Sequence, residues 1–203
     1  MPLWKHFNSD NWKHSFMDKD LAYLLGAAGD AAITHRKSKG EYCIEFEQKN
    51  YHWLQDSIVP RIRRTFGKTI TVKRRKSGLF RARLYSKAAF LQFHRYKKNP
   101  SLVLEAGNEA KVCFVRGFFD AEGSAPKRKE GTQYRIQIYQ KDRRVLKVIS
   151  RIIKGFGIRA GNITNSRDVG QLPIRRKENV RKFARIIGCE HPDKSKALEK
   201  LCS

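Results

Sequence analysis

The sequence predicts an α+β fold in which one unit of helix, hairpin, helix, hairpin and helix occurs twice, as an αββαββα duplication. Three observations predict it. Residues 44–50 and 136–142 both alternate apolar and polar residues, and both end in Gln-Lys followed by Asn or Asp. An amphipathic helical pattern follows each segment, and an apolar helix rich in small residues precedes each. Two similar halves related by a pseudo-two-fold axis are therefore expected.

The remaining elements follow in the same order in both copies. Asn50 and Asp142 are good N-caps for the helices that begin after them, and Gly67 and Gly157 suit the C′ position where these helices end. Residues 69–73 and 80–85 predict the second hairpin of the first copy, and residues 158–164 and 171–174 predict that of the second. A final amphipathic helix closes each copy, with matched residues Lys87, Phe90 and Phe93, and Lys177, Val180 and Phe183.

The repeat also predicts the domain boundaries. Residues 1–98 form the first half and residues 109–203 the second, which ends in a basic tail at residues 194–203 that is expected to form a short helix. Residues 99–108 contain Pro100 and Gly107 and are expected to link the halves.

The charge of the chain predicts a polyanionic partner. Lys and Arg number 44 against 19 Asp and Glu, a net charge of +25, whose self-repulsion a nucleic acid would relieve. No apolar run has the length of a membrane span, and the N-terminus lacks the apolar region of a signal peptide, so an intracellular, cytoplasmic protein near the nucleoid DNA is expected, with no membrane partner. The four cysteines are scattered without a CxxC pair, which argues against a zinc finger.

Two carboxylates at equivalent places are the candidate catalytic groups. Asp30 precedes Gln48 by 18 residues, and Glu122 precedes Gln140 by the same 18. Small residues in the preceding helices would let them pack closely and bring their C-terminal ends together. An acid at a helix C-terminus is electrostatically unfavourable, so a cation should compensate it. Lysines could supply that charge, and divalent metal ions are the sharper hypothesis.

The duplicated Gln48-Lys49 and Gln140-Lys141 pairs are the second group of candidates. Placed near the acids, they would order water and stabilise phosphate charge around the metal ions. In the alternative interpretation, Asp30 and Glu122 are ordinary polar residues at helix ends. The Gln-Lys pairs are then solvated surface residues before a capped helix.

Residues 115–123, Val-Arg-Gly-Phe-Phe-Asp-Ala-Glu-Gly, resemble the LAGLIDADG motif, and residues 24–31 are a poorer copy of it. The resemblance, over residues 18–187, is to monomeric two-motif LAGLIDADG homing endonucleases of archaeal introns. It implies saddle-shaped sheets that lie along the major groove of double-stranded DNA, and metal ions held by Asp30 and Glu122 with the flanking Gly29 and Ala31. It also suggests Lys127 as a basic residue that assists near Glu122.

The register of the first motif has two solutions. Matching Gly26 to the motif glycine puts Ala31 in the acidic place, whereas matching residues 29–30 to the last small-acidic pair puts Asp30 there. The shared spacing to Gln-Lys favours Asp30.

Long polar side chains alternate with apolar ones along the predicted strands, as in Arg81 and Arg83 around Ala82. Arg and Gln can read guanine and adenine edges, and other basic residues would hold phosphates. The alternative for any single one of these side chains is that it lies on a solvated sheet face without a partner in DNA. The predicted DNA-binding residues are Lys37, Lys39, Lys73, Arg75, Arg81, Arg83, Tyr85, Arg128, Arg135, Gln137, Tyr139, Arg167 and Arg175.

Two functions remain open on the sequence. The first is a site-specific endonuclease, active as a monomer, that cuts both DNA strands with two or more Mg²⁺ ions, for which Mn²⁺ or Ca²⁺ can substitute in binding. The second is a non-cleaving relative, such as a maturase that binds intron RNA or a regulator. The two acids and the two Gln-Lys pairs favour the nuclease.

Overall fold

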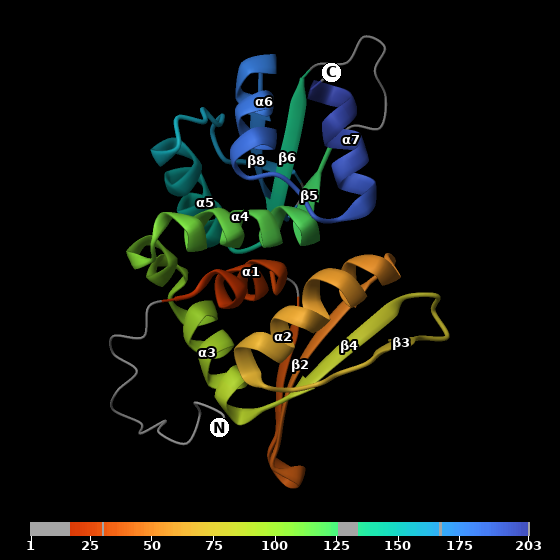
Figure 1. Cartoon of the computed structure of the whole chain (residues 1–203). Helices are drawn as coiled ribbons and strands as arrows, with labels where there is room; N and C mark the ends of the chain where they lie inside the picture. Colours follow the sequence, from red (N-terminus) through yellow and green to blue (C-terminus); the bar gives the residue numbers. More distant parts are fainter. Residues whose placement is uncertain (1–16, 30, 126–133, 167, 203) are drawn as a thin grey trace.

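The computed structural model describes residues 17–29, 31–125, 134–166 and 168–202, and shows two similar halves stacked on a central pair of helices (Figure 1). The first half contains α1 (Lys19–Ala27), β1 (Ala32–Arg36), β2 (Glu41–Gln48), α2 (Val59–Phe66), β3 (Val72–Arg74), β4 (Phe80–Tyr85) and α3 (Lys87–Lys98). A 3-10 helix, η3 (Lys37–Lys39), joins β1 to β2, and a π-helical segment, η4 (Trp53–Ile58), leads into α2.

The second half repeats this order. A 3-10 helix, η5 (Pro100–Glu105), lies in the segment between α3 and α4. Then follow α4 (Asn108–Glu122), β5 (Gly123–Ser124), β6 (Arg135–Gln140), α5 (Arg143–Gly155), β7 (Thr164–Ser166), β8 (Val169–Arg175), α6 (Lys177–Ile186) and α7 (Pro192–Cys202). The antiparallel sheets have the orders β1-β2-β4-β3 and β5-β6-β8-β7, so corresponding strands hold corresponding places and the predicted duplication is confirmed.

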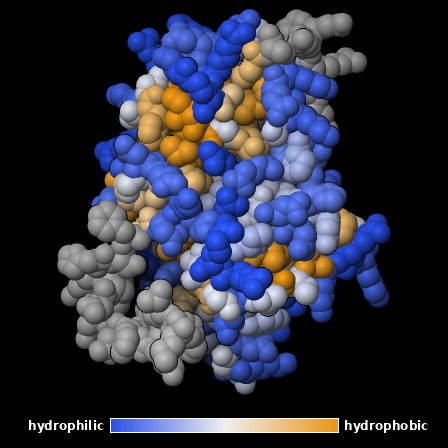
Figure 2. Space-filling view, in the orientation of Figure 1, coloured by the Kyte–Doolittle hydropathy of each residue, from blue (hydrophilic) through white to orange (hydrophobic). Residues whose placement is uncertain are grey.

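The strands bury one face and expose the other, as their alternation predicts. Ile44, Phe46, Ala82 and Leu84 are buried in the first sheet, and Ile136, Ile138, Leu172 and Ile174 in the second. The helices cover this buried face. Hydrophilic residues cover most of the face seen in Figure 2, with a hydrophobic area in the upper half. The four cysteines are free thiols, and no described helix is long and apolar enough to cross a membrane.

The predicted helix caps are confirmed. The Asn50 side chain accepts a hydrogen bond from the Trp53 amide at 3.0 Å, and the Asp142 side chain accepts one from the Arg144 amide at 2.9 Å. Gly67 and Gly157 have left-handed φ angles of 63° and 71°, which cost glycine little.

The predicted outer strands, residues 69–73 and 158–164, begin and end too early, because β3 spans Val72–Arg74 and β7 spans Thr164–Ser166. Strand β7 begins only at Thr164, because Pro173 on β8 has no N–H to continue the hydrogen-bond ladder. Before Thr164, the Gly161 amide donates a hydrogen bond to the Pro173 carbonyl at 2.8 Å. Strand β3 begins at Val72, and residues 69–71 before it line a groove together with residues of β4. The first helix ends at Ala27 rather than running to residue 30, and α7 begins at Pro192 rather than at residue 194.

Two glycines let the central helices touch backbone to backbone. A Cβ on Gly26 would lie 2.1 Å from the Phe114 carbonyl oxygen, and a Cβ on Gly117 would lie 2.3 Å from that of Tyr23. Only glycine permits such an approach. Helices α1 and α4 therefore form the interface between the halves.

We predict that Gly26→Ala or Gly117→Ala lowers the free energy of unfolding by about 3 kcal/mol or more, because the backbones must separate to admit the methyl group. Urea unfolding followed by circular dichroism measures this. The control is Gly155→Ala near the end of α5, where a Cβ meets nothing within 4 Å and which should add about 0.5 kcal/mol. Equal effects at all three glycines would contradict the close approach.

A buried tyrosine offers a second stability test. The Tyr96 hydroxyl is buried without a hydrogen-bond partner among the described residues, and burial raises its pKa. Because an unsatisfied polar group costs free energy, Tyr96→Phe should stabilise the fold by about 1 kcal/mol. Tyr23→Phe is the matched comparison and should destabilise it by about 2 kcal/mol, since the Tyr23 hydroxyl donates to Asp120 at 2.6 Å and accepts from Trp53 at 2.9 Å. Thermal unfolding of both variants tests the opposite signs.

Candidate functional site

The C-terminal ends of α1 and α4 lie side by side because of the glycine contacts. Gly29 follows α1, and a Cβ added there would lie 3.1 Å from Cγ of Glu122, the last residue of α4. The Gln140 side-chain nitrogen donates to the Gly29 carbonyl at 3.3 Å. A residue of the second half thus touches the helix end of the first. The predicted site residues Gly29, Glu122 and Gln140 are brought together here.

A cleft of about 270 Å³ opens at these helix ends. It draws on both halves, and it contains three of the predicted site residues, Ala31, Gln48 and Glu122. Its lining comprises Ala27, Ala31, Ala32, Glu45, Phe46, Glu47, Gln48, Trp53, Ala121 and Glu122. Asp30 and Lys127 lie outside the described residues.

The two Gln-Lys pairs have the same local geometry. The side-chain oxygen of Gln48 accepts from the Lys49 amide at 2.8 Å, and that of Gln140 accepts from the Lys141 amide at 2.6 Å. These bonds occupy the two side-chain oxygens, so the side-chain nitrogens are the atoms that can donate to another group. Gln48 lines the cleft and Gln140 reaches Gly29, whereas the Lys49 and Lys141 side chains are exposed.

The donor set at the cleft suits a hard divalent cation. Glu122 lines the cleft, and the Gly29 carbonyl lies at the same helix ends, whereas the Glu45 and Glu47 carboxylates pair with arginines of the sheet. Carboxylate and carbonyl oxygens are the preferred ligands of Mg²⁺ and Ca²⁺. In the described part of the chain no three His, Cys, Asp or Glu residues converge on one metal position. A metal held here would keep coordination positions for water or phosphate.

The first motif has one residue fewer between its helix and its strand. In the packing of the two central helices, Gly26 of the first half is equivalent to Gly117 of the second, an offset of 91 residues. In the strands, Gln48 is equivalent to Gln140, an offset of 92 residues. The helix packing therefore matches Ala31 to Glu122, and the strand pairing favours Asp30. Each of the two registers considered from the sequence has a structural counterpart.

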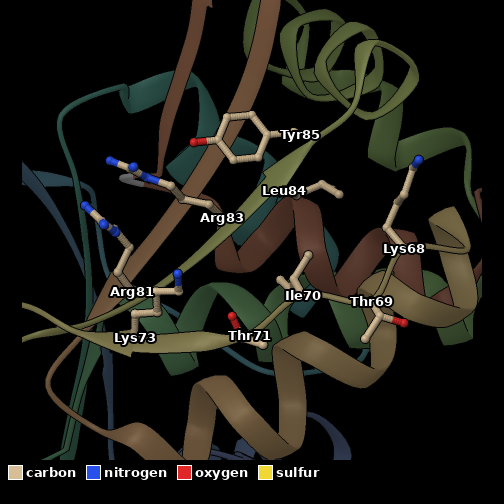
Figure 3. A pocket seen from close by; sticks show the side chains of 9 residues that line it. All are labelled: Lys68, Thr69, Ile70, Thr71, Lys73, Arg81, Arg83, Leu84 and Tyr85. Atoms are coloured by element: carbon tan, nitrogen blue, oxygen red, sulfur yellow. The ribbon is translucent and has the colours of Figure 1, made fainter.

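The outward sheet faces carry most of the described DNA-binding candidates. Lys73, Arg81, Arg83 and Tyr85 line a groove of about 370 Å³ on the first sheet, with Lys68, Thr69, Ile70, Thr71 and Leu84 (Figure 3). On the second sheet, the Tyr139 hydroxyl and the Gln137 side-chain amide are 2.7 Å apart, and Arg135 pairs in register with Arg175. Lys37 and Lys39 are exposed between β1 and β2. Arg128 and Arg167 lie outside the described residues.

Two glutamates on β2 hold the arginines of the first sheet. Glu45 forms ion pairs with Arg83 and, at 3.8 Å, with Arg81, and Glu47 pairs with Arg75. Glu45 lies opposite Arg83 on the neighbouring strand β4, whereas Arg75 follows β3, which β4 separates from β2. These ion pairs fix the directions of side chains that would otherwise be mobile, and they lower the local positive charge next to the cleft.

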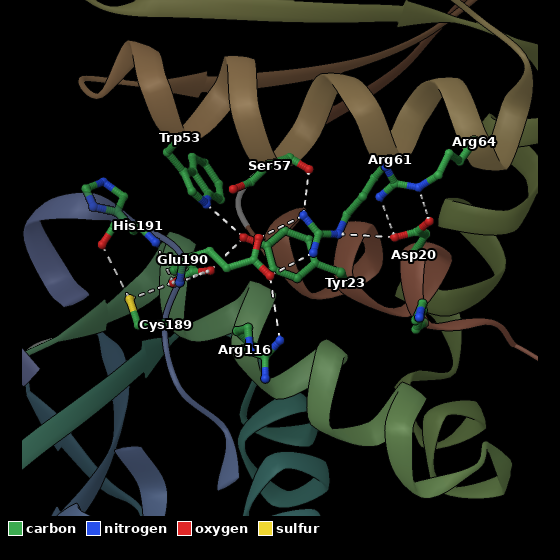
Figure 4. A network of polar contacts seen from close by, with 12 residues as sticks. Asp20, Tyr23, Trp53, Ser57, Arg61, Arg64, Arg116, Cys189, Glu190 and His191 are labelled. Atoms are coloured by element: carbon green, nitrogen blue, oxygen red, sulfur yellow. Dashed lines mark hydrogen bonds and ion pairs between the residues drawn. The ribbon is translucent and has the colours of Figure 1, made fainter. Parts of the chain in front are cut away.

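A buried polar network lies behind the helix ends (Figure 4). Asp120 is fully buried, and its carboxylate accepts hydrogen bonds from the Tyr23 hydroxyl at 2.6 Å, the Cys189 thiol at 2.8 Å, and the amides of Glu190 and His191 at 3.0 and 3.1 Å. Burial raises the pKa of Asp120 and of Cys189, although the bonds to Asp120 oppose its own shift. The network fastens the segment before α7 to both central helices.

Glu190 extends this network to α2. Arg61 donates two hydrogen bonds to the Glu190 carboxylate at 2.7 and 2.8 Å, and its guanidinium carbon lies 3.8 Å from the centre of the Tyr23 ring. Asp20 joins Arg61 at 3.4 Å and Arg64 at 2.6 Å, and the bond from Arg64 lowers the pKa of Asp20. The C-terminal segment is thereby tied to the first half (Figure 4).

Sequence reasoning missed Asp120, the two strand glutamates and Lys194. The roles of Glu45 and Glu47 could have been predicted. Both alternate with apolar residues on the strand that lies beside the strand with Arg81 and Arg83. Asp120 and Lys194 leave no such signal, because their partners lie about 70 residues away along the chain.

Comparisons with known proteins agree with this geometry. Residues 109–188 match the family described as LAGLIDADG-like domain. The homing endonuclease I-ApeI of Aeropyrum pernix is 29% identical over 195 residues, which cover 89% of this chain and 86% of that protein. The uncharacterized protein MJ0398 of Methanocaldococcus jannaschii is 27% identical and covers 97% of this chain and 78% of its own length.

Solved structures show the same fold. The homing endonuclease I-DmoI in complex with DNA and Mn has a TM-score of 0.68 at 22% identity, covering 85% of this chain and 98% of that chain. The N-terminal LAGLIDADG domain of DUF199/WhiA has a TM-score of 0.61 at 17% identity, covering 86% of this chain and 84% of that chain.

The buried histidine of the network predicts a pH dependence of stability. Burial, with a smaller effect of Lys194, lowers the pKa of His191 to about 4. Below its usual pKa of about 6.5, His191 binds a proton in the unfolded state but not in the folded one, so stability falls as the pH falls from 6.5 toward 4. Between pH 7 and pH 5 we expect a loss of about 1–2 kcal/mol that His191→Phe abolishes, measured by urea unfolding.

The control is His52→Phe, because His52 is exposed. This variant should keep the wild-type loss. The same loss in His191→Phe as in wild type would show that His191 is not the source.

Proposed function

This chain is a two-motif relative of the LAGLIDADG homing endonucleases, and from that premise we propose that it is a site-specific endonuclease that cuts both strands of a double-stranded DNA target with divalent metal. The observation that carries the proposal is the convergence of both helix ends on one cleft, with Glu122 in its lining and Gln48 and Gln140 around it. A protein that only binds DNA has no use for acids where phosphates approach.

The outward sheet faces would bind the duplex. The net charge of +25 favours binding through release of counterions from the phosphates. Arg135 and Gln137 on one sheet, and Arg81 and Arg83 on the other, have the donors that read base edges in the major groove. The Glu45 and Glu47 pairs would hold such arginines in place before DNA arrives. I-DmoI has been solved in complex with DNA and Mn, and with DNA and Ca, which supports the same use here.

The cleft would hold the scissile phosphates. Glu122 and the acid of the first motif, Asp30, would bind divalent ions, with Mg²⁺ as the expected metal and the carbonyl of Gly29 as a further oxygen ligand. When bound, such ions neutralise the phosphate and lower the pKa of an attacking water. The side-chain nitrogens of Gln48 and Gln140 would orient that water, and the exposed Lys49 and Lys141 would offset the charge that develops on phosphate.

The two halves differ in sequence, which suits a long target that is not symmetric. One chain contains both motifs and both sheets, so a monomer supplies a complete site. Such a substrate lies with the DNA of the cell, in the cytoplasm around the nucleoid. Thermodynamically, phosphate contacts would supply the affinity and base contacts the choice of site.

We predict that the wild-type protein linearises a plasmid that contains the intron-less form of its host gene, with Mg²⁺ and not with EDTA. Glu122→Gln should slow this reaction by at least about 100-fold, because a metal ligand is lost. Asp30→Asn should have a similar effect. The matched control is Glu109→Gln at the exposed start of the same helix, which should cut like wild type. Gel electrophoresis of time courses measures all four proteins.

The outcomes separate the hypotheses. Loss of cutting in Glu122→Gln alone would remove Asp30 from the ligand set. Tight, salt-dependent binding without cutting by the wild-type protein would contradict the nuclease and favour a binding protein, for which intron RNA is the next ligand to test.

A further inference from the structure

The end of α4 is occupied by a lysine from the C-terminal helix. The carbonyls of the last turn of any helix lack partners within it and carry partial negative charge. The Lys194 ammonium donates to three successive carbonyls at this end of α4, Phe119 at 3.1 Å, Asp120 at 2.6 Å and Ala121 at 3.0 Å, and the Phe119 carbonyl also accepts from the Gly123 amide. Since an ammonium has three N–H donors, these bonds use its whole capacity.

Lys194 is also an electrostatic partner of the acids at this end. Burial lowers its pKa, whereas the charges of Asp120 and Glu122 oppose that shift. Removing an ammonium even partly from water costs free energy unless it is paired and hydrogen-bonded, and the partly buried Lys194 meets both conditions. The cation that an acid at a helix C-terminus requires is therefore supplied at α4 by the protein itself.

The position of Lys194 is fixed by its own segment. The amides of Lys194 and Ser195 donate to the His191 carbonyl at 3.0 and 2.8 Å, and the His191 amide donates to Asp120. Helix α7 starts beside the end of α4 (Figure 1). The described part of the first half has no counterpart of α7; there, Lys97 donates to the single carbonyl of Ala31 at 3.2 Å, beyond the end of α1.

We infer that Lys194 is a positioning residue, a built-in cation that holds the last turn of α4 and so keeps the Glu122 carboxylate in place at the cleft before any metal binds. This inference rests on the proposed function for the role of Glu122. It also predicts an asymmetry, because Lys194 serves α4 alone. In the proposed function each helix end would serve one strand of the duplex, so cutting of one strand should depend on Lys194 more than cutting of the other.

The test compares Lys194→Gln with Lys196→Gln. Lys196 is an exposed lysine of the same helix, so the control removes the same charge from the chain. Glutamine is shorter than lysine and has no charge, so it leaves carbonyls of the last α4 turn without their cation. Lys194→Arg restores the charge.

The first readout is thermal unfolding without DNA, with and without Ca²⁺. In Lys194→Gln the carbonyls of Asp120 and Ala121 beside Glu122 become available as oxygen ligands, so Ca²⁺ should raise the Tm by about 3–5 °C more than in wild type. Lys196→Gln and Lys194→Arg should respond like wild type. An identical Ca²⁺ response in Lys194→Gln and Lys196→Gln would overturn the inference, since a merely structural lysine would lower the Tm without creating a cation site.

The second readout is plasmid cleavage. Nicked circles should accumulate with Lys194→Gln, with cutting of the second strand at least about tenfold slower than in wild type, and Lys194→Arg should restore linear product. Equal slowing of both strands would contradict the asymmetry. If the wild-type protein does not cut at all, the proposed function fails, and the Ca²⁺ response alone decides the role of Lys194.

Discussion

The close approach of α1 and α4 through Gly26 and Gly117 is the constraint on which the rest of the structure depends. It lets two backbones touch where any side chain would separate them, and so it sets the two helix ends side by side. Gln140 can then reach Gly29, Tyr23 can reach Asp120, and residues of both halves can line one cleft. Because of this helix contact, the two similar halves contribute different residues to the same cleft.

Charge is the second organising constraint. The interface places Asp120 and Glu122 near the C-terminus of α4, where the backbone already contributes negative charge. The chain compensates there in two ways: Lys194 donates to carbonyls of the last turn, and four hydrogen-bond donors surround the Asp120 carboxylate. On the sheet, glutamates hold the arginines that face outward. Three carboxylates of this strongly basic protein, those of Glu45, Glu47 and Glu122, therefore belong to residues that line the cleft, where a phosphate and its cations would have to fit.

Much of the fold could be predicted, because the signals are local and occur twice. The N-caps Asn50 and Asp142, the C′ glycines and the buried alternation of each strand are all as expected. The outer strands were predicted to begin and end too early, and at β7 the effect of Pro173 depends on which strand it pairs with. In the site, Glu122, Gln48 and Gln140 follow from the repeat, whereas Lys194 and Asp120 act through contacts about 70 residues apart that no periodicity records.

The central claim is that the paired helix ends form one metal site between the halves. Anomalous diffraction from crystals of the protein with its target DNA and Mn²⁺ tests it most directly. The account predicts an anomalous peak within coordination distance, about 2.2 Å, of a Glu122 carboxylate oxygen, at the junction of α1 and α4. Manganese bound elsewhere on the complex, with Glu122 turned away from every peak, would contradict it.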